Sequence, residues 1–113
     1  LPNYHAQVGD YTNEKLVQLG LFTSSDIKNN PKSYLKYFMH GTSHHLGLDV
    51  HDVMHRFEPI TEDSVLTIEP GIYIPEEGIG VRIENDVWLH NGEMIDLMAD
   101  FPIETEEIEQ AMN

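Results

Sequence analysis

The side chains best suited to chemistry are concentrated in residues 40–52, which read His-Gly-Thr-Ser-His-His-Leu-Gly-Leu-Asp-Val-His-Asp. Five of the 7 histidines lie between His40 and His55. Imidazole titrates near neutral pH and is a common metal ligand, so such a cluster is typical of a metal-binding or proton-transfer site. A polar loop whose histidines bond backbone groups is the alternative. The pattern alone does not say which imidazole binds a ligand.

Two carboxylates, Glu69 and Glu84, occur where a strand would hold them in a fixed orientation. Glu69 follows the apolar run 65–68 and precedes Pro70, and a residue before proline is driven into extended backbone. Glu84 lies in residues 80–89, where period-two alternation separates a polar face from an apolar face. The polar face holds Arg82, Glu84 and Asp86, and the apolar face holds Val81, Ile83, Val87 and Leu89. A solvated strand face with an Arg–Glu pair is the alternative for Glu84.

One imidazole and two strand carboxylates form a ligand set for a hard cation. Nitrogen and oxygen ligands suit Mn²⁺, Fe²⁺, Co²⁺ or Zn²⁺, and the sequence has no cysteine that would offer a thiolate. Two adjacent ions would need further carboxylates to offset their charge. Asp10 and Asp26 are expected in helix-start and turn contexts, so a site built from these residues alone would be short of ligands.

The elements that must position these residues are predicted to be helices first and strands afterwards. We expect a helix capped by Thr12 and ended by Gly20, a short helix capped by Ser24 or Ser25, and a helix over residues 31–38 begun by Asn30-Pro31. Strands are expected over residues 65–69, 72–74, 79–89 and 93–97, with an Asn91-Gly92 hairpin turn. Thr105 would cap a last helix through Met112. This order predicts the α+β class.

Composition narrows the function further. The chain has 113 residues and a formal net charge of −14, which argues against nucleic acid and anionic membranes as partners. A mean hydropathy of −0.37 argues against a membrane span. The cysteine-free sequence is compatible with the cytoplasm, which is the expected location. We expect no signal peptide, and the missing initiator Met suggests an excised piece.

Three ordered motifs carry a resemblance to a known family. Residues 40–52, 67–73 and 80–86 resemble, in order and spacing, the C-terminal part of Xaa-Pro aminopeptidases, which are dinuclear metallopeptidases of the pita-bread family M24. The resemblance implies that residues 1–113 are the C-terminal part of a catalytic domain, with the C-terminal half of a pita-bread fold and helices packed on an antiparallel sheet. It also implies two further metal-binding aspartates upstream, which this chain lacks.

The resemblance assigns roles to individual residues. It implies that His44 and Glu69 bind one metal ion, with Glu69 also handling the proton, and that Glu84 bridges two ions. His40 and His51 would line the substrate pocket, with His51 stabilising developing charge, so the implied catalytic residues are Glu69, His51 and His40. The implied substrate-binding residues are His40, His51 and Arg82. His45 and His55 match no role of the family.

The implied activity is release of the N-terminal residue from peptides with proline second, by attack of a metal-bridging hydroxide. Two divalent metal ions are expected, Mn²⁺ foremost, with Co²⁺, Fe²⁺ or Zn²⁺ as alternatives. This fragment alone would be inactive, and self-association is a further expectation from the family. Alternatives are a prolidase, a creatinase-like amidinohydrolase and a non-catalytic pita-bread binding module; the presence of His44, Glu69 and Glu84 together disfavours the last two.

Overall fold

The computed structural model describes residues 2–54 and 57–113, and it confirms the predicted α+β class. The helices are α1 (Pro2–Gln18), α2 (Ser24–Asn29) and α3 (Thr105–Met112), with the short 3₁₀ helices η1 (Ser33–Lys36) and η2 (Pro75–Glu77). The strands are β1 (Val65–Ile68), β2 (Gly71–Ile74), β3 (Ile79–Arg82), β4 (Asn85–His90) and β5 (Glu93–Asp96). None of the described helices is long and apolar enough to cross a membrane.

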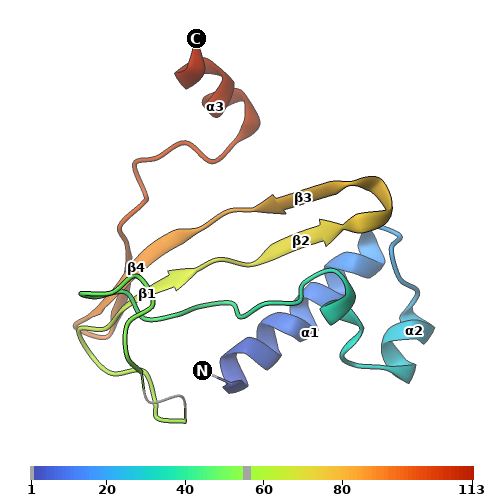
Figure 1. Cartoon of the computed structure of the whole chain (residues 1–113), viewed down its shortest axis with the longest axis horizontal. Coiled ribbons are helices and arrows are strands. Elements are labelled where there is room, and N and C mark those ends of the chain that lie inside the picture. Colours follow the sequence, from blue (N-terminus) through green and yellow to red (C-terminus); the bar gives the residue numbers. More distant parts are fainter. Residues whose placement is uncertain (1, 55–56) are drawn as a thin grey trace.

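The strands form a long antiparallel ribbon with a third strand beside part of it. Strand β1 pairs with β4 and β2 pairs with β3, and Figure 1 shows β2 continuing the line of β1 while β4 continues that of β3. Strand β5 pairs with the outer edge of β4. The turn between β4 and β5 has positive φ at Asn91 (53°) and Gly92 (73°), as a two-residue hairpin turn requires, so the predicted Asn-Gly turn is confirmed.

The ribbon is interrupted at Pro70, and this corrects the expectation of one strand over residues 79–89. Proline has no backbone N–H and cannot donate to a strand partner. The segment formed by β1 and β2 is therefore interrupted at Glu69–Pro70. The segment formed by β3 and β4 is interrupted opposite it, between Arg82 and Asn85. The predicted strands over 65–69 and 72–74 correspond to β1 and β2 with their ends displaced by one residue.

The helices differ from the prediction mainly at their starts. Helix α1 begins at Pro2, so Thr12 is not its N-cap; the buried Thr12 hydroxyl donates to the carbonyl of Val8 instead. Thr23, rather than Ser24 or Ser25, caps α2 through a reciprocal capping box with Asp26. The hydrogen bonds from Thr23 lower the pKa of the Asp26 carboxyl.

Two further helix starts are corrected. Residues 31–38 hold only the 3₁₀ helix η1, preceded by an Asn30 whose side-chain oxygen accepts from the Lys32 amide and so forms a local turn. Helix α3 has Glu104 at the N-cap position, with Thr105 as its first residue.

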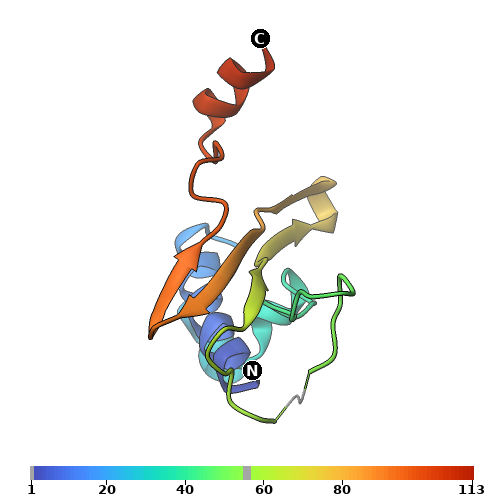
Figure 2. The same cartoon turned by 90° about the vertical axis from the view of Figure 1, so that its left-hand side faces the viewer.

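An aromatic core joins α1 to the ribbon. Its buried members are Leu16, Tyr34, Tyr37 and Phe38, and Ile72 and Ile74 of β2 pack against them. A backbone bond from the Tyr73 amide to the Tyr37 carbonyl (2.8 Å) ties the segment after η1 to β2. Figures 1 and 2 accordingly show α1 lying along one side of the strands, while α3 stands apart from this body. The core thus fixes the segment that leads into residues 40–52.

Candidate metal centre

The two predicted strand carboxylates face each other across the break in the ribbon. Ile68 pairs with Asn85 on one side of the break, and Gly71 pairs with Arg82 on the other. Both ladders have the same register, so Glu69 lies opposite Glu84. Side chains directly opposite in an antiparallel pair project to the same face of the sheet. Pro70 therefore opens the ladder at the point where two carboxylates meet.

His44 reaches these carboxylates because its segment lies along the free edge of β1. The Thr67 amide donates to the His44 carbonyl (3.0 Å), and the Glu69 amide donates to the Thr42 carbonyl (2.8 Å). An isolated antiparallel bridge joins His45 to Leu66. This pairing brings His44 Nε2 to 3.3 Å from Glu69 Oε1, with both side chains largely shielded from solvent.

The hydrogen bonds of His44 define which nitrogen is available. Its Nδ1 lies 3.0 Å from the carbonyl oxygen of His45, which only accepts, so Nδ1 carries the proton. Nε2 of the neutral ring then presents a lone pair toward Glu69. A lone pair and a carboxylate oxygen at 3.3 Å repel each other unless a proton or a cation lies between them. A backbone carbonyl bonded to the second ring nitrogen is also the usual arrangement of a metal-binding histidine.

Thr67, which lies on the same face of β1, holds both groups. Its hydroxyl accepts the His44 backbone amide (3.1 Å) and donates to Glu69 Oε1 (3.2 Å). The side chain is buried, with 1% of the residue exposed. Thr67 has no chemical signature in the sequence, and only its position two residues before Glu69 on a strand indicates a shared face.

Arg82 and His51 complete the immediate surroundings. Arg82 Nη1 lies 3.8 Å from Glu69 Oε2, whereas His44 approaches the other carboxylate oxygen. The ring of His51 is tilted against that of His44, with centroids 4.2 Å apart. The predicted placement of Arg82 and Glu84 on one strand face agrees with the geometry, and the register shows that Glu69 lies on the same face.

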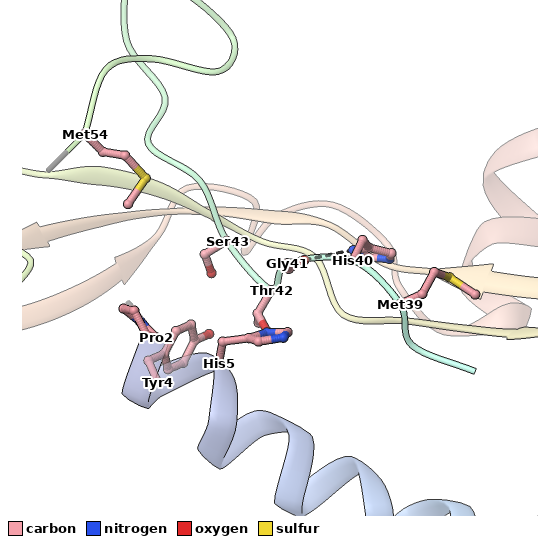
Figure 3. A pocket seen from close by; sticks show the side chains of 9 residues that line it. All are labelled: Pro2, Tyr4, His5, Met39, His40, Gly41, Thr42, Ser43 and Met54. Carbon is pink, nitrogen blue, oxygen red and sulfur yellow. Dashed lines mark hydrogen bonds between the residues drawn. The ribbon is translucent and has the colours of Figure 1, made fainter. Parts of the chain in front are cut away.

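His40 lies farther along the same loop and contacts a different set of groups. Its Nδ1 is 2.8 Å from the Gly41 carbonyl and its Nε2 is 3.0 Å from the Tyr73 hydroxyl, while the ring packs edge-on against Phe38. Because Nδ1 must donate to the carbonyl, neutral Nε2 accepts the Tyr73 hydrogen. His40 also borders a pocket of about 520 Å³ between the loop and the start of α1 (Figure 3).

The residues that could hold a metal ion are His44, Glu69 and Glu84, whose ligand atoms all lie within 4.8 Å of one another. One nitrogen and two carboxylates fit a divalent first-row cation, but three ligands leave an octahedral ion open on several sides. Another group, Glu62, Asp63 and His90, meets the same distance criterion. It is more exposed, and His90 Nδ1 already bonds Asp63 Oδ1 at 2.7 Å.

Among the described residues, His45 offers no ring nitrogen to the group of His44, Glu69 and Glu84. His45 contributes its carbonyl oxygen to the Nδ1 of His44 and to the Asp52 amide. His55, which also matched no role of the family, lies outside the described residues.

Comparisons with known proteins give a consistent result. The model of metallopeptidase family M24 matches residues 5–91. The human Xaa-Pro aminopeptidase 3 is 40% identical over 97% of this chain and 24% of its own length. The Escherichia coli Xaa-Pro aminopeptidase is 40% identical over 86% of this chain and 25% of its own length. The chain thus spans about a quarter of these relatives.

Solved structures extend the agreement to three dimensions. Zn-substituted E. coli aminopeptidase P in complex with product superposes with a TM-score of 0.81 at 36% identity, over 95% of this chain and 27% of that chain. The same TM-score and coverage hold for the E. coli enzyme with the inhibitor Pro-Leu. The expected relation to the pita-bread fold is confirmed. A histidine and two glutamates brought together at a strand break, within a fold and sequence of this kind, place the chain in metallopeptidase family M24.

Proposed function

We propose that this chain is the C-terminal part of the catalytic domain of a metal-dependent aminopeptidase, which releases the N-terminal residue from peptides with proline second. The observation that carries the proposal is the convergence of His44, Glu69 and Glu84. Matched relatives named Xaa-Pro aminopeptidase, and a matched structure that holds the inhibitor Pro-Leu, support the choice of substrate class.

The proposed cofactor is a pair of divalent ions, Mn²⁺ foremost. His44 Nε2 and the carboxylates of Glu69 and Glu84 would hold them, and the bound ions would supply Lewis-acid polarisation of the scissile carbonyl. Two ions need more ligands than this chain offers. We therefore propose that the remaining ligands come from a segment upstream, and that residues 1–113 alone are inactive. Self-association and a cytoplasmic location remain further proposals.

The chain's own residues have distinct tasks in this proposal. Glu69 accepts a proton on the carboxylate that the Thr67 hydroxyl holds in position through Oε1. Arg82 places its guanidinium 3.8 Å from Oε2 of the same carboxylate, on the side where the substrate would bind. His51, whose ring is tilted against that of His44, faces the substrate and stabilises charge that develops on the peptide. His40 binds the substrate from the pocket side, oriented by Tyr73.

The substrate class is tested with the complete protein that contains this chain, in the presence of Mn²⁺. We expect release of the first residue from an Xaa-Pro-Yaa tripeptide and little hydrolysis of an Xaa-Pro dipeptide. Hydrolysis of the dipeptide only would identify a prolidase. A metal-loaded protein that hydrolyses neither has another substrate, and a protein that binds no divalent metal is a non-catalytic module.

The metal site is tested with Glu84→Gln, which keeps the size of the side chain and removes its charge. We expect kcat for the tripeptide to fall by at least a hundredfold, since a bridging carboxylate cannot be replaced by a neutral amide. Bound Mn²⁺, measured by elemental analysis, should fall as well. Glu77→Gln is the matched control, because Glu77 is an exposed residue of the η2 turn. Substantial turnover by Glu84→Gln would refute the assignment.

A further inference from the structure

A histidine outside the predicted site contacts the loop that carries His40 and His44. His5 lies in the first turns of α1, and its Nδ1 is 2.8 Å from the Thr42 hydroxyl oxygen. Figure 3 shows the His5 ring on the helix beneath the loop, directed at Thr42. Its edge packs against the rings of Tyr34 (6.0 Å between centroids) and Phe38 (5.6 Å). The hydrogen bond between His5 and Thr42 thus links helix α1 to the loop of residues 40–52.

Thr42 occupies the middle of the predicted site. It lies two residues after His40 and two before His44, and only 2% of it is exposed. Its carbonyl accepts the backbone amide of Glu69 at 2.8 Å. A displacement of Thr42 would therefore move both histidines and the carboxylate together, and its own side chain is fixed by His5.

We propose that His5 is a positioning residue of the site, which fixes the Thr42 hydroxyl and through it the spacing of His40, His44 and Glu69. His5 itself touches neither the metal ligands nor, in this arrangement, the reacting atoms. The inference rests on the proposed function: its kinetic readout needs the proposed substrate, and its metal-binding readout needs the proposed metal site. Its metal-binding readout does not depend on the substrate.

The chemistry of His5 suits a fixed neutral hydrogen-bonding group. Burial, and then the proximity of the His40 imidazole, lower the pKa of His5, which favours its uncharged form. A neutral ring offers one N–H and one lone pair, and the threonine hydroxyl can rotate to match either. The bond costs little desolvation because no charge is buried.

A role in packing alone makes a different prediction. If His5 served only to cover Tyr34 and Phe38, a phenylalanine would fill the same space with a more apolar ring and would leave the site unchanged. If the hydrogen bond to Thr42 positions the site, a phenylalanine at position 5 should weaken metal binding. Asparagine, whose amide lies near the position of Nδ1, should then restore part of the effect although it loses ring contacts.

The experiment uses the complete protein with His5→Phe, His5→Asn, Thr42→Val and the His5→Phe/Thr42→Val double variant. Mn²⁺ affinity is measured by calorimetry on protein freed of metal, and kcat and KM on the Xaa-Pro-Yaa tripeptide. We expect His5→Phe and Thr42→Val each to weaken Mn²⁺ binding about tenfold, the lower end of what outer groups of a metal site contribute. The double variant should be no worse than either single one. His5→Asn should bind within about threefold of the unmodified protein.

Tyr11→Phe is the control on the same helix, because Tyr11 is 59% exposed. The proposal would be overturned by any of three results. These are unchanged Mn²⁺ affinity in His5→Phe, additive losses of affinity in the double variant, and a loss of affinity in His5→Asn as large as in His5→Phe. If Thr42→Val does not fold, the comparison of His5→Phe with His5→Asn decides. A complete protein that binds Mn²⁺ but does not hydrolyse the tripeptide contradicts the proposed function, while the comparison of Mn²⁺ affinities still tests the role of His5. A complete protein that binds no Mn²⁺ overturns both the proposed function and the proposed role of His5.

Discussion

Thr67 shows how a single hydroxyl can hold two functional groups. It accepts the amide of His44 and donates to the carboxylate of Glu69, and it is 1% exposed. A buried hydroxyl that both donates and accepts a hydrogen bond is costly to remove, because its two partners are then left without a hydrogen bond and cannot reach water. Thr67 therefore bears on both the stability of the fold and the geometry of the metal centre.

We predict that Thr67→Val, which keeps the shape of the side chain, lowers the free energy of unfolding by about 1–3 kcal/mol. It should also weaken Mn²⁺ binding by about tenfold, because Glu69 loses the donor that orients it. Chemical denaturation and calorimetry measure the two effects. Thr67→Ser should preserve most of both quantities, and Thr105→Val, at an exposed site, should change neither. Full Mn²⁺ affinity in Thr67→Val would contradict this account of Glu69.

The sequence indicated the proposed metal ligands but not the side chains that hold them in place. Glu69 and Glu84 could be selected because a carboxylate in a strand next to apolar residues is unusual. The histidine cluster could be selected as a whole, and within it only the family resemblance indicated His44. His5 and Thr67 carry no such signal, since a histidine on a helix and a threonine on a strand are ordinary. Their roles follow from a hydrogen bond across 37 residues and from a loop pairing with β1, neither of which has a local pattern.

At the scale of the elements, the interruption of the ribbon at Pro70 is the main feature that positions the two glutamates. Pro70 separates the β1–β4 ladder from the β2–β3 ladder, and the two ladders keep the same register. The hydrogen bonding between the strands is therefore interrupted while Glu69 stays opposite Glu84. Period-two alternation predicted the face of Arg82 and Glu84 correctly. It could not predict the split of the strand over residues 79–89, because the cause is a proline on the partner strand.

Two glycines of the ribbon make room for Tyr73, whose hydroxyl bonds His40. A Cβ on Gly71 would lie 2.6 Å from the Tyr73 hydroxyl oxygen, and one on Gly80 would lie 2.8 Å from its Cδ1. Gly80 is also the direct cross-strand partner of Tyr73. The aromatic ring thus lies over backbone that has no side chains, and this position directs its hydroxyl to His40.

We predict that Gly71→Ala displaces Tyr73 and lowers kcat/KM for the tripeptide by roughly three- to tenfold, the worth of about one hydrogen bond. Tyr73→Phe, which removes only the hydroxyl, should reproduce the loss. Gly92→Ala is the control: its φ of 73° makes alanine unfavourable, but a Cβ there meets nothing within 4 Å. It should lower stability and leave kcat/KM unchanged. If Gly71→Ala retains full activity, Tyr73 does not orient His40.

At the scale of the whole molecule, the chain is less compact than an independent domain of its length. The radius of gyration is 16.1 Å, whereas a compact domain of this length has about 13 Å. Only six apolar residues of the described chain are buried: Leu16, Tyr34, Tyr37, Phe38, Leu66 and Val87. Leu48 (104%), Val53 (89%) and Phe57 (88%) are almost fully exposed. Apolar residues so exposed near a site with too few ligands are expected where a further part of the protein packs.

We therefore predict that the isolated 113-residue chain binds Mn²⁺ at least a hundredfold more weakly than the complete protein and does not hydrolyse the tripeptide. Three ligands cannot fill the coordination shell of such an ion, and the carboxylates that would balance a second ion are missing. The isolated chain should also bind a fluorescent apolar dye that the complete protein does not bind, because Leu48, Val53 and Phe57 would be covered there. Glu84→Gln in the isolated chain should abolish the residual Mn²⁺ binding. Turnover by the isolated chain would show instead that His44, Glu69 and Glu84 suffice, and would remove the need for an upstream half.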